Sequence, residues 1–415
     1  MDILAFGKRG DCYMFQKKVK AVEMHDPELM VVYDLFGSFS HFEEFGLLPR
    51  IINQYEFYSQ YLKSVCIQTW DSTNYENFLP NNIKHITFSD IPIKKLFYFF
   101  LSGIMNCLKY SPNYVEVTHI TGILPAIPYK LFKKSKLILV FNWDFAHFVK
   151  ELKGTSMGYV ANLLQLFALK TADLILASTP SLVKEASIHV PYSKIILLPN
   201  YVDTNLFAPN NSVNRVTKRL IFVGRLHPQK NLYMLLDVMK QLPEFSLQIV
   251  GDGPLHKDLI GIKNMYNIHN VDFLGAVPHT ELPKYLNQSD AFIFTTNIEG
   301  HPKALIEAMS CGLPCIGSNV EGIRGIISDG ETGVLCDRSV ESIKNCIDTL
   351  FKNKLLMDML GKNARAYVID NFSQEVILNK KIRYLTGRDW DDNSRNAKPL
   401  DKDEIRMSSS EIQKR

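Results

Sequence analysis

Cysteine is scarce in this sequence of 415 residues, and its distribution argues against two kinds of stabilising site. The seven cysteines are scattered and include no C-x-x-C pair, so neither a disulfide framework nor a zinc site is indicated. We therefore expect reduced thiols in a cytoplasmic protein. The apolar start of MDILAFGKRGD is also too short for the hydrophobic region of a signal peptide.

Long apolar runs are absent as well. The most apolar segment, residues 96–108, is shorter than the roughly 20 residues that a membrane-spanning helix needs. Two lysines precede it, and a basic cluster follows further along the chain. This cluster comprises Lys130, Lys133, Lys134 and Lys136. Two interpretations stay open: a helix buried in its own domain, or peripheral contact with the inner face of a membrane, where lysines attract anionic lipid.

Neither sign of charge is in large excess. The chain has 47 basic and 43 acidic residues, a formal net charge of +4, which argues against nucleic acid as a partner. A hydrophobic fraction of 46% with 22% charged residues is typical of globular proteins. The length is sufficient for two domains of ordinary size, each with its own core.

Short apolar runs alternate with helical patterns in the first half of the chain, which is typical of βαβ units and a parallel sheet. We predict strands at 2–6, 29–33, 65–69, 85–88, 114–120, 137–141 and 174–177. Helical patterns occupy 41–63, 92–110, 122–133, 156–171 and 179–188. These elements predict a Rossmann-like domain. Residues 7–11, with two glycines, are then either a ligand-facing loop after the first strand or a plain turn.

The most informative stretch is IEGHPKALIEAMSCGLPCIG, residues 298–317. Glu299 precedes a helix that Pro302 opens, because its fixed φ suits the first turn. Glu307 lies inside this helix, on the same face as Lys303. A ligand with phosphate and hydroxyl groups would meet the positive helix end and both carboxylates. The alternative for Glu307 is a solvated surface carboxylate.

A second motif, LIFVGRLHPQKN, opens the second half of the chain at residues 220–231. A strand ends at Gly224, and a helix begins near Asn231, so Arg225 and Lys230 lie near the amino end of that helix. Two cations at such a position suit a diphosphate, because their charged contacts add to the exposed amides. They would otherwise be ordinary surface charges.

Together these motifs resemble the retaining glycosyltransferases of family 4, which have the GT-B fold. The setting E-G-x-P-x-x-x-x-E-A-M-x-C-G-x-P is specific, and G-R-x-x-x-x-K accompanies it. The resemblance covers about residues 170–385. It implies an α/β fold of the GT-B type, with two Rossmann-like β/α/β domains that face each other across a cleft.

The resemblance also implies roles in binding a nucleotide-sugar donor. Glu307 would hold the ribose hydroxyls, Glu299 would face the sugar, and Arg225 and Lys230 would bind the diphosphate. The turn that contains Val277 would bind the base through its backbone. The donor-binding set implied in this way is Gly224, Arg225, Lys230, Gly253, Val277, Glu299, Gly300, His301, Pro302, Lys303, Ala304, Leu305 and Glu307.

The loop NWDFAH, residues 142–147, follows a predicted strand of the first domain. Ligands bind beyond the carboxyl ends of parallel strands, so polar residues here face the predicted cleft. Related glycosyltransferases often carry a histidine or aspartate at this turn, which makes Asp144 and His147 candidates beside the reacting sugar. The alternative is a helix cap or a solvated side chain.

We predict a transferase that moves a sugar from a UDP- or GDP-linked donor to an acceptor hydroxyl of a carbohydrate or lipid-linked molecule, with retention at the anomeric carbon. It would need no cofactor and no metal, because the donor loops contain no Asp-x-Asp. A sugar-nucleotide epimerase and a non-catalytic carbohydrate-binding protein remain as alternatives. The predicted units are an acceptor domain at 1–207, a linker at 208–218, a donor domain at 219–371, a helix crossing back at 372–388 and a disordered tail at 389–415.

Overall fold

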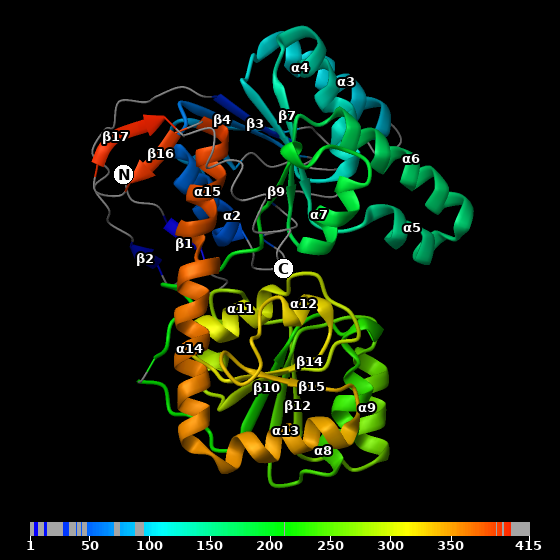
Figure 1. Ribbon diagram of the computed structural model, residues 1–415, viewed down its shortest axis with the longest axis vertical. Coiled ribbons are helices and arrows are strands. Elements are labelled where there is room, and N and C mark those ends of the chain that lie inside the picture. The colour runs from blue at the N-terminus through cyan, green and yellow to red at the C-terminus, as the bar shows by residue number, and fades with distance from the viewer. Residues whose placement is uncertain are drawn as a thin grey trace.

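The computed structural model describes residues 4–6, 12–14, 28–32, 39, 43, 48–69, 75–87, 95–210, 212–386, 388–391 and 394–399. Its two large sheets are both parallel and lie one above the other, each flanked by helices (Figure 1). This arrangement confirms the predicted α/β class with two Rossmann-like units.

The first sheet has seven strands in the order β5-β4-β3-β6-β7-β8-β9. Adjacent residues of β7 belong to core clusters on opposite faces, Leu137 to one and Ile138 to the other. Burial on both faces explains why β7 is a nearly continuous apolar run. The strands are β3 (Glu28–Val32), β4 (Ser64–Gln68), β5 (Ile83–Ile86), β6 (Tyr114–Val117), β7 (Lys136–Phe141), β8 (Leu174–Ala177) and β9 (Ile195–Leu197). The helices between them include α2 (Leu48–Ser59), α3 (Lys95–Lys109), α4 (Ile123–Lys133), α5 (Phe145–Lys153), α6 (Thr155–Thr171) and α7 (Pro180–Ser187).

The start of the chain differs from the prediction. β1 (Leu4–Phe6) pairs in antiparallel fashion with β2 (Cys12–Met14) and does not join the large sheet. The strand at which the order reverses is β3, which lies between β4 and β6. An apolar run identifies a strand but not the strands beside it. The prediction that the first strand belongs to the large sheet was therefore wrong. The predicted loop at residues 7–11 lies outside the described residues.

The second sheet has six parallel strands in the order β12-β11-β10-β13-β14-β15. Its core is a single cluster that includes Phe222, Phe292 and Phe294. The strands are β10 (Arg219–Val223), β11 (Ser246–Val250), β12 (Val271–Gly275), β13 (Ala291–Phe294), β14 (Cys315–Ser318) and β15 (Val334–Cys336). The helices around them include α8 (Leu232–Lys240), α9 (His256–Met265), α10 (Leu282–Asn287), α11 (Lys303–Ser310), α12 (Glu321–Arg324) and α13 (Val340–Lys352).

The chain crosses between the two units twice, at neighbouring places. α14 (Lys354–Phe372) runs along the second unit, and α15 (Gln374–Thr386) continues beside the first (Figure 1). Val202 and Ser373 form a parallel bridge where the two crossings meet. On α15, the ammonium group of Lys381 lies 2.7 and 2.8 Å from the two carboxylate oxygens of Glu116, and both side chains are buried.

Beyond α15, β16 (Arg388–Asp391) and β17 (Ser394–Pro399) form an antiparallel pair. For these residues the structure differs from the predicted disordered tail, because a local ladder pairs their backbone groups. Residues 400–415 lie outside the description. No helix in the described part of the chain combines the length and hydrophobicity that a membrane crossing requires.

Candidate active site

The turns after β10 and β11 pack backbone against backbone. A Cβ atom at Gly251 would lie 2.0 Å from the carbonyl oxygen of Gly224, and one at Gly253 would lie 2.5 Å from that of Leu226. Only glycine permits this approach. The packing holds the predicted diphosphate turn at the carboxyl edge of the sheet, where the side chain of Arg225 is exposed.

The structure brings two predicted catalytic residues into direct contact. The ammonium group of Lys230 contacts Oε1 of Glu299, and the hydroxyl of Thr296 donates to the same oxygen at 3.1 Å. Nε2 of Gln229 donates to the carbonyl of Ile298 at 2.7 Å and ties the two loops together. The side chains of Lys230 and Glu299 are only 14% and 8% exposed, so they form a largely buried ion pair.

Glu307 on α11 is buried, which excludes the solvated surface carboxylate considered above. Its Oε1 lies 2.9 Å from Nε2 of His279, and the His279 ring packs on Phe207 at 4.9 Å between centroids. Burial alone would raise the pKa of Glu307. The hydrogen bond and charge of His279, with the charges of Arg50 and Lys303, lower that pKa below its usual value. Glu307 is therefore held as a carboxylate.

His301 occupies the variable position of the E-G-x-P motif. Both ring nitrogens are buried and have no hydrogen-bond partner among the described residues. The ring meets Phe372 edge-on at 4.8 Å. Burial lowers the pKa of His301 to about 4, and the charge of Lys303 adds to this effect. The imidazole is therefore neutral near pH 7, with one ring nitrogen as a donor and the other as an acceptor.

The first turn of α11 carries Lys303. The helix begins there, with Pro302 as the preceding cap residue, one position later than predicted. Desolvation lowers the pKa of Lys303 to about 7, although part of its side chain is exposed to solvent. Arg50 lowers the pKa further, while Glu307 opposes the shift.

The first unit reaches this site through the ends of β8 and β9. Nδ2 of Asn200 donates to the carbonyl of His301 at 2.7 Å. The methyl group of Thr179 lies 3.5 Å from the Cβ position of Gly300. Both contacts come from the carboxyl edge of the first sheet, which places the E-G-x-P motif between the two sheets.

Arg50 on α2 was not among the predicted residues. Its guanidinium lies 5.4 Å from the ring centroid of Tyr201, and the Tyr201 hydroxyl donates to Oε1 of Gln54 at 2.8 Å. Arg50 and Lys303 are more than 250 positions apart in sequence, so no local motif connects them. Only the folded chain shows that both act on Glu307.

Asp144 has a structural role in the described structure. Its Oδ1 accepts from the backbone amide of His147 at 3.1 Å and caps α5, and Nε2 of Gln165 lies 3.2 Å from the same oxygen. Asp144 is thus the helix cap that the sequence analysis gave as the alternative to a role beside the sugar. His147 is exposed on the first turn of α5. A role for either residue beside the reacting sugar remains a prediction.

His119 is a histidine that the sequence analysis did not single out. It follows β6 at the same sheet edge as Asn200, and its ring packs against Trp143 and Phe145 at 5.3 and 5.2 Å. The prediction extended this strand to residue 120 and so placed His119 inside it. β6 ends at Val117, and a polar T-H pair just before the turn was the available signal.

The side chains of three predicted donor-binding residues face the core of the second unit. The Leu305 side chain is buried in the core of the second unit, and Ala304 and Val277 pack against that core. The backbone of Gly322 packs directly against that of the E-G-x-P motif, because a Cβ atom at Gly322 would lie 2.2 Å from the carbonyl oxygen of Glu299. The position of the Glu299 backbone thus depends on a residue outside the predicted set.

Residues 205–367 match the family model described as Glycosyl transferases group 1. UDP-Gal:alpha-D-GlcNAc-diphosphoundecaprenol alpha-1,3-galactosyltransferase of Escherichia coli is 27% identical over 360 residues, which cover 80% of this chain and 88% of that protein.

Two solved structures share the fold. Sucrose-phosphate synthase from Thermosynechococcus elongatus aligns with a TM-score of 0.72 at 17% identity, covering 87% of this chain and 98% of that one. The Anabaena protein HepE in complex with UDP-glucose aligns with a TM-score of 0.67 at 16% identity, covering 86% and 99%. At such identities these structures support the fold alone, and they confirm the predicted pair of facing domains.

Proposed function

This chain belongs to the glycosyl transferases group 1 family, and we propose that it transfers a hexose from a UDP-sugar to a hydroxyl group of a lipid-linked acceptor. The E. coli relative supports both substrates, because its name gives UDP-Gal as donor and a diphosphoundecaprenol-linked sugar as acceptor. Its alignment extends over both domains. A lipid-linked acceptor also implies that the enzyme works at a membrane surface.

The observation that carries the proposal is the buried contact between Lys230 and Glu299. Lys230 would stabilise the negative charge that develops on the leaving diphosphate, with the exposed Arg225 beside it. Glu299 holds the ammonium group in place before the donor binds, so little reorganisation is needed during the reaction. Glu299 would then hydrogen-bond to the sugar.

Glu307 would bind the ribose hydroxyls of the donor, since its lowered pKa keeps it an acceptor. The second domain would therefore hold the donor, and the first domain would hold the acceptor. Asn200 and Thr179, which contact the E-G-x-P motif from the first domain, are well placed to respond to closure of the two domains.

Retention at the anomeric carbon requires no protein base in this proposal. The bond between the anomeric carbon and the diphosphate oxygen breaks, and the acceptor oxygen forms a bond on the same face. The acceptor proton passes to the leaving phosphate oxygen. The protein supplies position and electrostatic stabilisation.

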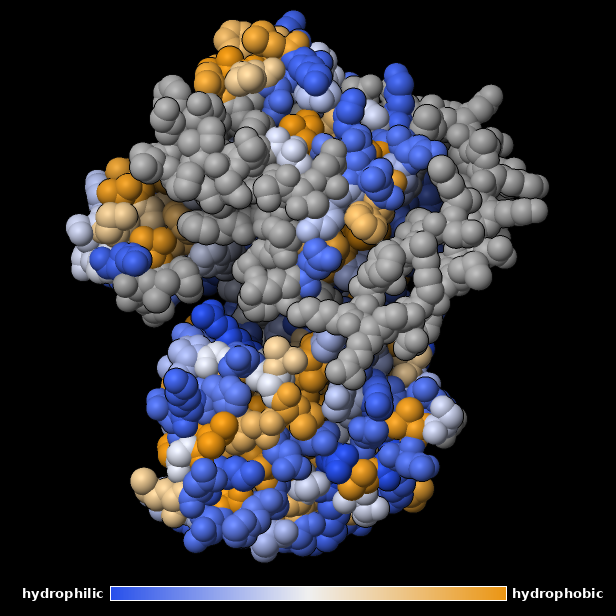
Figure 2. Space-filling model, turned by 180° about the vertical axis from the view of Figure 1, so that it is seen from behind, coloured by the Kyte–Doolittle hydropathy of each residue, from blue (hydrophilic) through white to orange (hydrophobic). Residues whose placement is uncertain are grey.

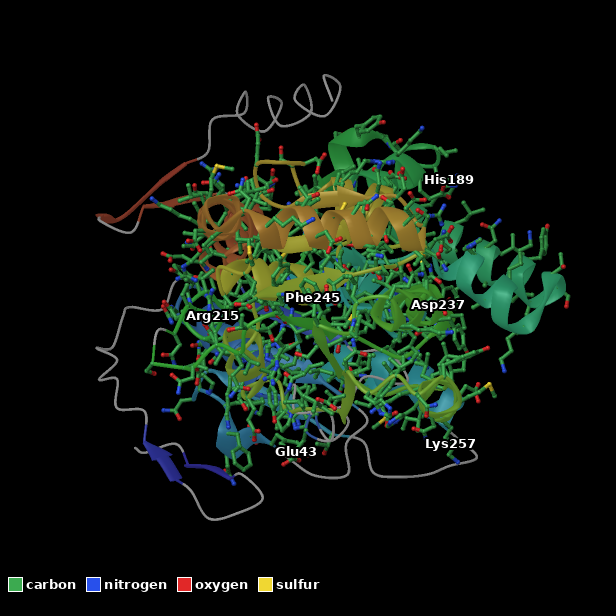
Figure 3. The ribbon with its side chains drawn as sticks, turned by 90° about the horizontal axis from the view of Figure 1, so that it is seen from below. Glu43, His189, Arg215, Asp237, Phe245 and Lys257 are labelled. Atoms are coloured by element: carbon green, nitrogen blue, oxygen red, sulfur yellow. The ribbon has the colours of Figure 1, made fainter. Side chains whose placement is uncertain are left out.

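The test is nucleotide release from a panel of UDP- and GDP-hexoses, with and without a prenyl-diphosphate-linked N-acetylhexosamine. We expect UDP release that depends on the acceptor and an α-linked product. Lys257→Ala, an exposed lysine on α9, is the matched control for Lys230→Ala (Figure 3). Conversion of the donor sugar without acceptor would instead support an epimerase, and absence of nucleotide binding would support a non-catalytic binding protein.

A further inference from the structure

The hairpin of α5 and α6 projects from the first domain (Figures 1 and 3). The two helices pack closely through a small residue, since a Cβ atom at Gly158 would lie 2.5 Å from Cβ of Lys150. Other small residues on the buried face of α6 are Ala161 and Ala168. The inner face of α6 is therefore built for close approach, with few large side chains to bury.

Five large apolar side chains of α6 point away from this buried face, whereas Leu169 is buried. Between 44% and 66% of each of five such residues is exposed. They are Met157, Tyr159, Val160, Leu163 and Phe167, and we call them the α6 ridge. Figure 2 shows hydrophobic surface on this projection, at the left edge of the view. A helix of a water-facing domain normally buries such residues. An exposed apolar face on the same helix indicates that the ridge meets an apolar phase.

Lysines outnumber acidic residues on the hairpin that carries the ridge. Lys150, Lys153 and Lys170 are exposed on the hairpin. Glu151 is the only acidic residue between Phe145 and Thr171 in the sequence. Exposed apolar side chains flanked by lysines fit the interface of an anionic bilayer, where headgroup phosphates attract the ammonium groups.

We propose that the α6 ridge docks on an anionic lipid bilayer. A second copy of the chain fits less well, because a symmetric pair of ridges would bring lysines against lysines. The hairpin begins at Phe145, four residues after β7 ends at the sheet edge that meets the second domain. Docking through the ridge would thus hold the active site near the membrane surface. The benefit for a lipid-linked acceptor rests on the proposed function, whereas the docking itself does not.

The experiment is flotation of the full chain with vesicles of phosphatidylcholine, with or without roughly one-third phosphatidylglycerol. The test variant is Val160→Asp with Leu163→Asp. A matched variant on the second domain is Met265→Asp with Leu355→Asp, which are 73% and 83% exposed. A third variant, Leu131→Asp with Phe132→Asp, changes the carboxyl end of α4, where the two side chains are 69% and 75% exposed. The far-ultraviolet circular dichroism and melting temperature of each variant check its fold.

We expect binding to anionic vesicles only, weakened by salt and reduced about a hundredfold or more in the ridge variant. The second-domain variant should bind anionic vesicles as strongly as the wild-type protein does. Equal binding by the ridge variant, or loss only in the α4 variant, would overturn the proposal. So would sedimentation velocity showing a dimer that the ridge variant dissociates. Because no donor or acceptor is present, failure here is separate from failure of the proposed reaction.

Discussion

Acidification tests the buried, neutral state of His301. Its pKa is lowered to about 4, against 6.5 in an unfolded chain. Between these two values the unfolded chain binds a proton that the folded protein does not, so stability falls as the pH falls. Each pH unit in this window costs about 1.4 kcal/mol. Lowering the pH from about 6.5 to about 5 therefore removes about 2 kcal/mol through this residue.

The assay is urea unfolding near pH 7.5 and near pH 5, followed by fluorescence and circular dichroism, for the unchanged chain and for His301→Phe. Phenylalanine keeps an aromatic ring against Phe372 but has no group to protonate. The variant should lose about 2 kcal/mol less stability on acidification than the unchanged chain. His269→Phe, at an exposed histidine, is the control and should behave like the unchanged chain. Equal acid sensitivity of His301→Phe and the unchanged chain would refute the assignment of a buried neutral ring.

Three further predictions concern the donor site. Glu307→Gln should weaken nucleotide binding by roughly ten- to a hundredfold in calorimetry, because one charged hydrogen bond is lost, and unchanged affinity would remove Glu307 from the ribose site. Lys230→Ala should lower turnover by about 10²–10³-fold. An excess of chelator should leave the turnover of the wild-type enzyme unchanged; if chelator abolished turnover and added Mg²⁺ or Mn²⁺ restored it, the metal-free mechanism would be wrong. Gly322→Ala should lower turnover by about tenfold or more, since the added Cβ displaces the carbonyl of Glu299. Gly261→Ala, where nothing lies within 4 Å of the added atom, is its control, and equal turnover of the two variants would contradict the supporting role of Gly322.

Sequence patterns were sufficient where chemistry and local structure coincide. Lys230 and Glu299 each lie in a short motif that joins a strand end to a helix start, so the sequence brought both to one sheet edge. The continuous apolar runs of β7 and β8 likewise identified buried parallel strands. The alternation of strands and helices then predicted both sheets.

Other features depend on packing that no local pattern records. The β1 segment resembles a first strand, but pairing with β2 or with the large sheet is decided by tertiary contacts. Asp144 lies in a polar turn of the kind that carries catalytic residues, but its side chain caps the amino end of α5. Arg50 and His279 are single residues that belong to no recognisable motif, and they act on Glu307 only because the fold brings distant segments together.

The packing of α15 has a consequence for how the protein can be divided. Because this helix follows the second domain in the chain yet completes the core of the first, the first domain is discontinuous and the second is inserted into it. A fragment ending at Phe207 leaves Glu116, 2% exposed, without the ammonium group of Lys381. An uncompensated buried charge costs roughly 3–5 kcal/mol. The same cut removes three buried α15 side chains, Leu378, Ile382 and Leu385, from that core. The core of the second domain, in contrast, lies entirely between Val202 and Phe372. We therefore expect the donor half to fold when it is expressed alone, and the acceptor half to need α15 supplied as a separate peptide.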